Sequence, residues 1–76
     1  MQNRLHVVIG GYGRVGRYLA RMLEFEGHTV SVIDQDPLVF ECDESEEILG
    51  QKFVGTVFDR DVLEEAGIRD ADCFAA

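Results

Sequence analysis

A glycine-rich turn between an apolar run and a helix-like segment constrains this chain more than any other feature of its sequence. The run Leu5–Ile9, "LHVVI", is apolar on both alternating faces, which predicts a strand buried on both sides of a parallel sheet. Four glycines then fall within seven residues. Arg14–Phe25 follows with apolar residues at helical spacing, and Gly27 is placed to end that helix. A buried strand that passes through such a turn directly into a helix predicts α/β packing.

The alternation of strand-like and helix-like segments continues to the carboxyl end of the sequence. Further strands are expected at Thr29–Ile33, Lys52–Val57 and Ala71–Ala76, and further helices, capped by Asp36 and Asp59, from Pro37 to about Cys42 and at Arg60–Ala66. The inward face of the first helix is expected to carry Val15, Leu19, Met22 and Leu23. Because such alternation forms parallel sheets with right-handed crossovers, we expect one Rossmann-like α/β domain over residues 1–76. Its sheet has the predicted order 3-2-1-4, with helices on both faces, and is truncated after the fourth strand.

Composition and charge exclude several classes of function. With 76 residues, 46% of them apolar, the chain has the composition of one small globular domain. Its formal net charge of −8 makes nucleic acid and anionic membrane surfaces poor candidate partners. No apolar run approaches the roughly 18 residues of a membrane span, and no signal-peptide pattern is found, so we expect no direct membrane insertion.

The cysteines and the acidic residues do not form a recognisable metal site. Cys42 and Cys73 lack the spacing of a disulfide framework or a metal pair, and we expect both to be packing residues in a reduced, cytoplasmic setting. Acidic residues cluster before the third strand, at Glu41, Asp43, Glu44, Glu46 and Glu47. Their spacing matches no EF-hand loop, which favours a solvated acidic loop over a cation site.

The turn itself has the pattern G-x-G-x-x-G, formed by Gly11, Tyr12, Gly13, Arg14, Val15 and Gly16. Between a strand and a helix, this pattern is typical of a turn that binds the phosphates of a nucleotide. Gly11 is expected to permit the tight turn, Gly13 to let a pyrophosphate approach the backbone, and Gly16 to let the helix lie close to the strand. The free N–H groups at the start of the helix would then face the phosphates.

An acidic residue, Asp34, stands at the end of the second strand, about 20 residues after the turn. Its carboxylate can accept hydrogen bonds from the ribose hydroxyls of an adenosine, and its charge repels a 2′-phosphate, which favours NAD over NADP. The alternative is a glycine-rich turn that binds nothing, with Asp34 merely solvated. Arg14 either contacts phosphate or faces solvent, whereas Arg17 and Arg21 are assigned to a solvated helix face.

The segments "HVVIGGYGRVGRYLARMLEFEGHTVSVIDQDP" and "FDRDVLEEAGIRDADCFAA" resemble the amino-terminal lobe of RCK domains, also called TrkA-N or KTN domains. The resemblance covers Leu5–Ala76 and implies a cytoplasmic nucleotide-sensing module that regulates potassium channels and transporters. Its phosphate-binding turn corresponds to residues 11–16, and its ribose-binding acid to Asp34, with Gln35 beside it. A glycine-aspartate pair near the adenine in many members corresponds to Gly55 and Thr56, so Thr56 departs from the family pattern.

The resemblance implies a regulatory module and not an enzyme. The expected ligand is an adenine nucleotide, NAD(H) first, with ATP, ADP or AMP as alternatives, and the expected partner is a membrane potassium transporter or channel subunit. A Rossmann half binds a cofactor but supplies no catalytic group of its own. Two alternatives stay open, namely the cofactor-binding fragment of an NAD-dependent dehydrogenase and a degenerate interaction module without a ligand. The segment "DVLEEAGI-DAD" favours the regulatory module over the dehydrogenase.

A homodimer is also expected, because the predicted fold leaves apolar surface uncovered. Only the helix Arg60–Ala66 covers the second face of the predicted sheet, and the fourth strand is an open edge. We therefore expect Val7, Ile9, Val30, Val32 or their neighbours to be partly bare. The dimer is expected to bury this face or the region of Arg60–Ala66 and Ala71–Ala76, a pairing that the resemblance also implies.

Overall fold

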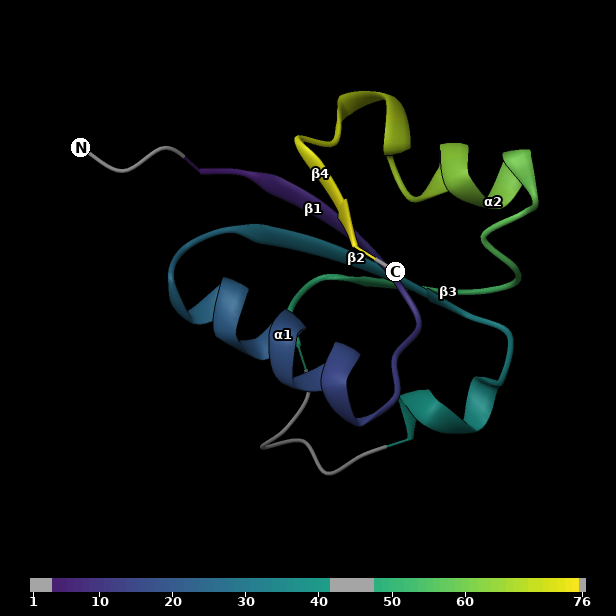
Figure 1. Cartoon of the computed structure of the whole chain (residues 1–76), viewed down its shortest axis with the longest axis horizontal. Coiled ribbons are helices and arrows are strands. Elements are labelled where there is room, and N and C mark those ends of the chain that lie inside the picture. The colour runs from purple at the N-terminus through teal and green to yellow at the C-terminus, as the bar shows by residue number, and fades with distance from the viewer. Residues whose placement is uncertain (1–3, 42–47, 76) are drawn as a thin grey trace.

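The fold is a four-stranded parallel sheet with helices on both of its faces (Figure 1). The structure is a computed structural model that describes residues 4–41 and 48–75. Its elements are β1 (His6–Gly10), α1 (Arg14–Phe25), β2 (Thr29–Asp34), η1 (Pro37–Phe40), β3 (Gln51–Val54), α2 (Arg60–Glu65), η3 (Ile68–Asp70) and β4 (Cys73–Ala75). The strand order β3-β2-β1-β4 confirms the predicted Rossmann-like topology.

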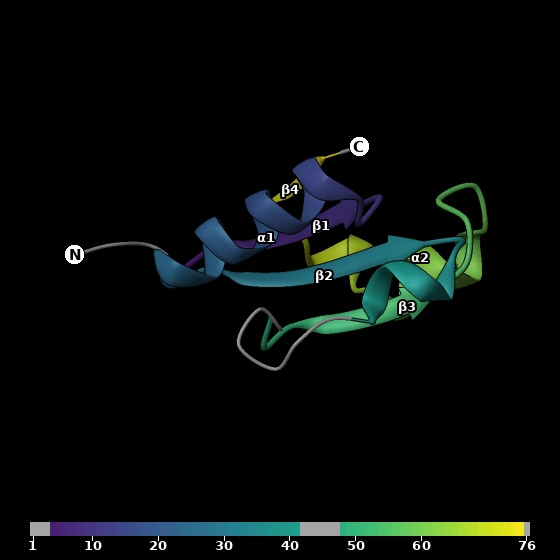
Figure 2. The ribbon, with the colours of Figure 1, turned by 90° about the horizontal axis from the view of Figure 1, so that it is seen from below.

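Two apolar clusters lie on opposite faces of the sheet. In Figure 1, α1 and η1 lie below the strands and α2 lies above them, and Figure 2 shows α1 running along the sheet. Val7 and Ile9 of β1 pack with α1, whereas Val8 packs on the other face with Ala66, at the end of α2. Because successive side chains of a strand point to opposite faces, the central strands are buried on both sides.

The face expected to be bare is covered. Val7, Ile9, Val30 and Val32 are at most 4% exposed, because the crossover from β1 to β2 places α1 over them. On the opposite face, Ile33 is also buried, among residues of the α2 region. The expectation of a bare face at these positions is therefore wrong.

The inward face of α1 agrees only in part with the predicted one, because Leu19 and Leu23 pack against the core as predicted but two other residues do not. Ala20 is fully buried, and a Cβ at Gly16 would overlap the carbonyl oxygen of Gly11. Val15 and Met22 were expected to pack inward, but they are 78% and 42% exposed. The helix approaches the sheet along Gly16, because only glycine permits so close a contact, and Val15 is turned about 100° away from it.

Several element boundaries differ from the predicted ones for local reasons. β3 ends at Val54, because the chain bends at Gly55 after its N–H makes the last bond to β2, to the carbonyl oxygen of Asp34 at 2.9 Å. The helix at Pro37 is a single 3-10 segment that ends at Phe40, and β4 spans only Cys73–Ala75. Cys42, most of the acidic loop and Ala76 lie outside the described residues.

Both predicted caps are present. The Asp36 side chain accepts from the N–H of Leu38 at 3.0 Å, and the Asp59 side chain accepts from that of Asp61 at 2.9 Å.

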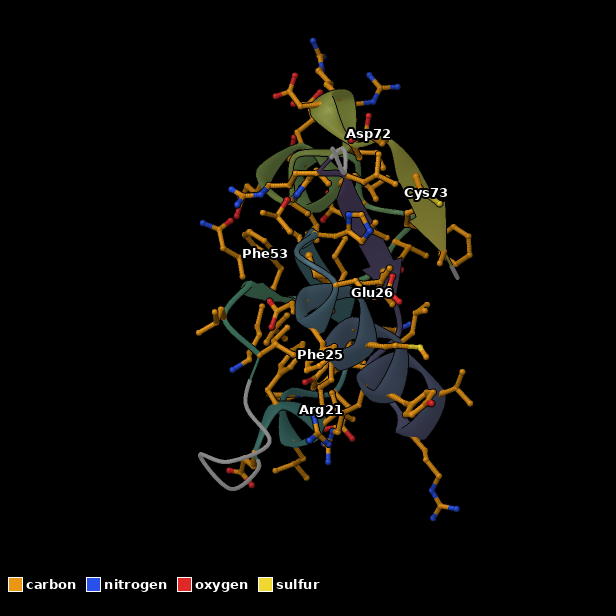
Figure 3. The ribbon with its side chains drawn as sticks, turned by 90° about the vertical axis from the view of Figure 1, so that its left-hand side faces the viewer. Arg21, Phe25, Glu26, Phe53, Asp72 and Cys73 are labelled. Carbon is orange, nitrogen blue, oxygen red and sulfur yellow. The ribbon has the colours of Figure 1, made fainter. Side chains whose placement is uncertain are left out.

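Cys73 is exposed on the edge strand β4 (Figure 3), so its expected packing role is wrong. None of the helices in residues 4–41 and 48–75 has the length and apolar character that crossing a membrane requires.

Candidate functional site

The candidate site lies at the carboxyl ends of the strands. It is centred on the end of β1, which has β2 on one side and β4 on the other. The chain leaves β1 towards β2 and β3, then returns to pair β4 on the opposite side of β1, so the order of the sheet reverses there. Ligands of open α/β sheets bind at such a switch point. One hollow is lined by Gly10, Gly11, Ile33, Asp34, Gln35, Gly55 and Val57. A second hollow, between β1, β4 and the first turn of α1, is lined by Ile9, Gly10, Gly11, Gly13, Arg14, Val15, Gly16, Leu19 and Ala75.

The phosphate-type turn has the backbone geometry that its glycines predict. Gly11 has φ of +109°, which L side chains rarely adopt, and its N–H donates to the carbonyl oxygen of Ile33 at 2.7 Å. A Cβ on Gly13 would meet no protein atom within 4 Å, so its open side faces away from the packed protein. Gly13 is also the N-cap of α1 and has no side chain to satisfy the first-turn N–H groups. This arrangement suits an anion.

The Asp34 carboxylate is fixed by two backbone donors at the end of β2. Its Oδ2 accepts from the N–H of Tyr12 at 2.8 Å, and its Oδ1 accepts from the N–H of Asp36 at 2.9 Å. Each carboxylate oxygen can accept more than one hydrogen bond, so both retain acceptor capacity. The acid is therefore held in place by the glycine turn while it can still accept bonds from a ligand.

Gly55 and Thr56, which the family resemblance places together near the adenine, have different surroundings in the structure. Gly55 lines the hollow beside Asp34, and a Cβ there would lie 2.8 Å from a methyl group of Val62 on α2. The Thr56 hydroxyl instead accepts from the N–H of Phe58 at 3.2 Å, within the turn before α2. Val57 lines the hollow in its place. Sequence reasoning missed Val57, since an apolar residue in a turn carries no binding signature.

The Tyr12 side chain belongs to the core and fills the turn. Its ring is fully buried, 5.3 Å from the ring of Phe40 between centroids. Gln35, Arg14 and Val15 are exposed around the site, and Arg14 lines the hollow at the start of α1. The part of Tyr12 that faces the site is its backbone N–H.

Arg17 does not lie on a purely solvated face. Its side chain is half-buried, its Nη2 donates to the carbonyl oxygen of Val39 at 2.7 Å, and its Cζ lies 5.3 Å from the centroid of the Tyr12 ring. Arg21, one turn later on α1, is exposed, as expected (Figure 3). Helical spacing alone missed Arg17, because its partner in η1 is 22 residues away.

A parallel sheet of this order, a glycine-rich turn into α1 and an acid at the end of β2 define a Rossmann-like nucleotide-binding domain. The family model of the TrkA-N domain matches residues 7–76. The chain belongs to the TrkA-N domain family, which confirms the resemblance found in the sequence.

Curated relatives are longer than this chain. The chain is 51% identical over 72 residues to a Trk system potassium uptake protein TrkA of Streptomyces coelicolor, covering 95% of this chain and 32% of that protein. It is 42% identical over 72 residues to a TrkA homolog of Pyrococcus abyssi, covering 95% of this chain and 31% of that protein. The chain thus spans about a third of the length of these relatives.

A solved structure has the same fold. The Shewanella denitrificans Kef CTD in its AMP-bound form superposes with a TM-score of 0.75 at 35% sequence identity. The match covers 91% of this chain and 40% of that chain.

Proposed function

We propose that this chain is the nucleotide-binding regulatory module of a potassium uptake or channel system, and that it binds an adenine nucleotide at the carboxyl edge of its sheet. The observation that carries the proposal is the hydrogen bond between Tyr12 N–H and Asp34, which joins a phosphate-type turn to a ribose-type acid. The names of the TrkA relatives and the AMP-bound state of the Kef structure support it.

In the proposed complex, each part of the nucleotide meets a different element. The phosphates lie at the start of α1, where Gly13 leaves room and Arg14 adds a positive charge. The ribose hydroxyls donate to the remaining acceptor sites of Asp34. The adenine occupies the hollow beside Gly55 and Val57, and Gln35 borders it.

NAD(H) is the proposed ligand, and AMP, ADP and ATP share the groups that this site would recognise. All of them carry an adenosine ribose for Asp34 and a 5′-phosphate for the start of α1. NADP(H) is disfavoured, because its 2′-phosphate would lie beside the Asp34 carboxylate.

The module is proposed to act without catalysis, in the cytoplasm, as one domain that forms part of a longer lobe. Its proposed partner is a membrane potassium transporter or channel subunit, in keeping with the names of its relatives. The proposed homodimer no longer rests on a bare sheet face. It rests on the region of α2 and β4, where Phe74 on the edge strand is 42% exposed.

Calorimetric titration of the 76-residue chain with NAD, NADH, ATP, ADP and AMP tests the nucleotide proposal. We expect saturable binding with one site per chain, abolished in a Gly13→Ala variant whose fold is intact. Absence of binding for all five nucleotides would favour the degenerate interaction module. Because the dehydrogenase alternative shares the same cofactor site, the regulatory role is tested separately, by nucleotide-dependent association with a potassium transporter subunit.

A further inference from the structure

The segment η1, which follows the ribose-type acid, is fastened to the rest of the site at both of its ends. At its start, the N–H of Asp36 donates to Asp34 at 2.9 Å. Near its end, the carbonyl oxygen of Val39 accepts from Arg17 at 2.7 Å, and the Phe40 ring packs 5.3 Å from the Tyr12 ring. A four-residue 3-10 segment is not stable alone, so these contacts hold it in place.

Arg17 contacts both η1 and Tyr12. Its guanidinium lies over the Tyr12 ring, at 5.3 Å from Cζ to the centroid, while its Nη2 binds Val39 in η1. The backbone N–H of the same Tyr12 donates to Asp34 at 2.8 Å. Arg17 is therefore connected to Asp34 in two ways. One connection runs through η1 and the N–H of Asp36, and the other runs through Tyr12.

We propose that Arg17 is a positioning residue for nucleotide binding, which keeps the Asp34 carboxylate aimed at the ribose hydroxyls. This inference rests on the proposed function. Arginine suits the task, because its planar guanidinium can stack on an aromatic face and donate in its own plane at the same time, and it keeps its charge at all working pH values. Lysine has a compact ammonium group and cannot make both contacts with the same geometry.

The physical reason for the effect is preorganisation. With Tyr12 and Asp36 fixed, the Asp34 carboxylate has its two donors in place before a nucleotide arrives. Without the Arg17 contacts, η1 and the donor at Asp36 are less constrained, so ribose binding must order them first. That ordering lowers affinity without removing any atom that touches the ligand.

The test compares AMP with 2′,3′-dideoxy-AMP, which keeps the phosphate and the adenine but lacks both ribose hydroxyls. Arg17→Met keeps an unbranched apolar stem and removes the guanidinium, which carries both the charge and the donors. Arg21→Met is the matched control, because it removes the same charge from an exposed site one turn along α1. Dissociation constants are measured for both ligands, and circular dichroism and thermal unfolding verify that each variant is folded.

We expect Arg17→Met to weaken AMP binding about tenfold, the size of one lost charge-assisted hydrogen bond, and to leave dideoxy-AMP binding within about twofold of the unmodified chain. Arg21→Met should change neither affinity by more than about twofold. Arg17→Lys is the second variant in case Arg17→Met does not fold, and it should show a smaller loss with the same dependence on the ribose hydroxyls.

Two results would overturn the inference while leaving the proposed function intact. An equal loss of affinity for AMP and dideoxy-AMP would show that Arg17 acts on the phosphate directly, and unchanged AMP binding in Arg17→Met would show that it has no role. Failure of the unmodified chain to bind AMP and the other adenine nucleotides would instead overturn the proposed function itself.

Discussion

The backbone N–H of Tyr12 donates to Oδ2 of Asp34 at 2.8 Å, across 22 residues of sequence. This bond ties the turn that would hold phosphates to the acid that would hold the ribose. The donor belongs to the backbone, so the bond joins the two halves of the site for as long as the Asp34 side chain keeps this conformation. The second bond, from the N–H of Asp36, supports that conformation.

Asp34 is expected to set the preference between NAD and NADP. The unmodified chain should bind NAD more tightly than NADP, because the carboxylate accepts from ribose hydroxyls and repels a 2′-phosphate. Asp34→Ala should weaken NAD binding about tenfold or more and reduce the bias against NADP. Calorimetric titration with both nucleotides measures this, with Asp34→Asn as a variant of matched size. Equal affinities of the unmodified chain for NAD and NADP would contradict the prediction.

Two glycines of the turn should respond differently to alanine. Gly13→Ala should abolish nucleotide binding while changing the free energy of unfolding by no more than about 0.5 kcal/mol, because its Cβ enters open space. Gly16→Ala should destabilise the fold by about 1–3 kcal/mol, because its Cβ overlaps the Gly11 carbonyl oxygen and must push α1 from β1.

Urea denaturation and nucleotide titration of the two variants separate these effects. Similar losses of stability in both variants, with binding retained in Gly13→Ala, would show that the turn serves the fold alone.

Glu24 is expected to stabilise the approach to β3. Its two carboxylate oxygens accept from the N–H groups of Leu49 and Gly50, at 2.8 and 2.7 Å. Glu24→Ala should lower the free energy of unfolding by about 1–3 kcal/mol, because two backbone donors lose a charged acceptor. Urea denaturation measures the loss, with Glu26→Ala at an exposed position as the control. A loss no larger than that of the control would show that water replaces the carboxylate.

The chain is expected to associate through the region of α2 and β4. β4 is an edge strand of the sheet, and its Phe74 is partly exposed. Light scattering at micromolar concentration should show a dimer, and Phe74→Glu should shift it towards monomer by placing a charge in the interface. A stable interface would bury on the order of 1,600 Å² in total. A monomer that unfolds cooperatively would contradict this prediction.

Much of the site could be predicted because it depends on local sequence. The strand before Gly11 and the helix after Gly13 follow from residue type and spacing over a few positions. The tight turn at Gly11 was likewise predictable, because a φ of +109° is accessible mainly to glycine. Asp34 was found for the same reason, since it ends a β-branched run at the distance from the turn that a βαβ unit requires.

The tertiary structure alone decided which surfaces are covered and how the site is held together. Periodicity shows that Val7 and Val8 face opposite ways, but the path of the crossover determines that α1 covers Val7. Likewise, Val15 is exposed because the close contact at Gly16 sets the rotation of α1. The bond from Arg17 to Val39 was hidden for a related reason. It joins residues far apart in the chain, and helical spacing describes only neighbours within a few turns.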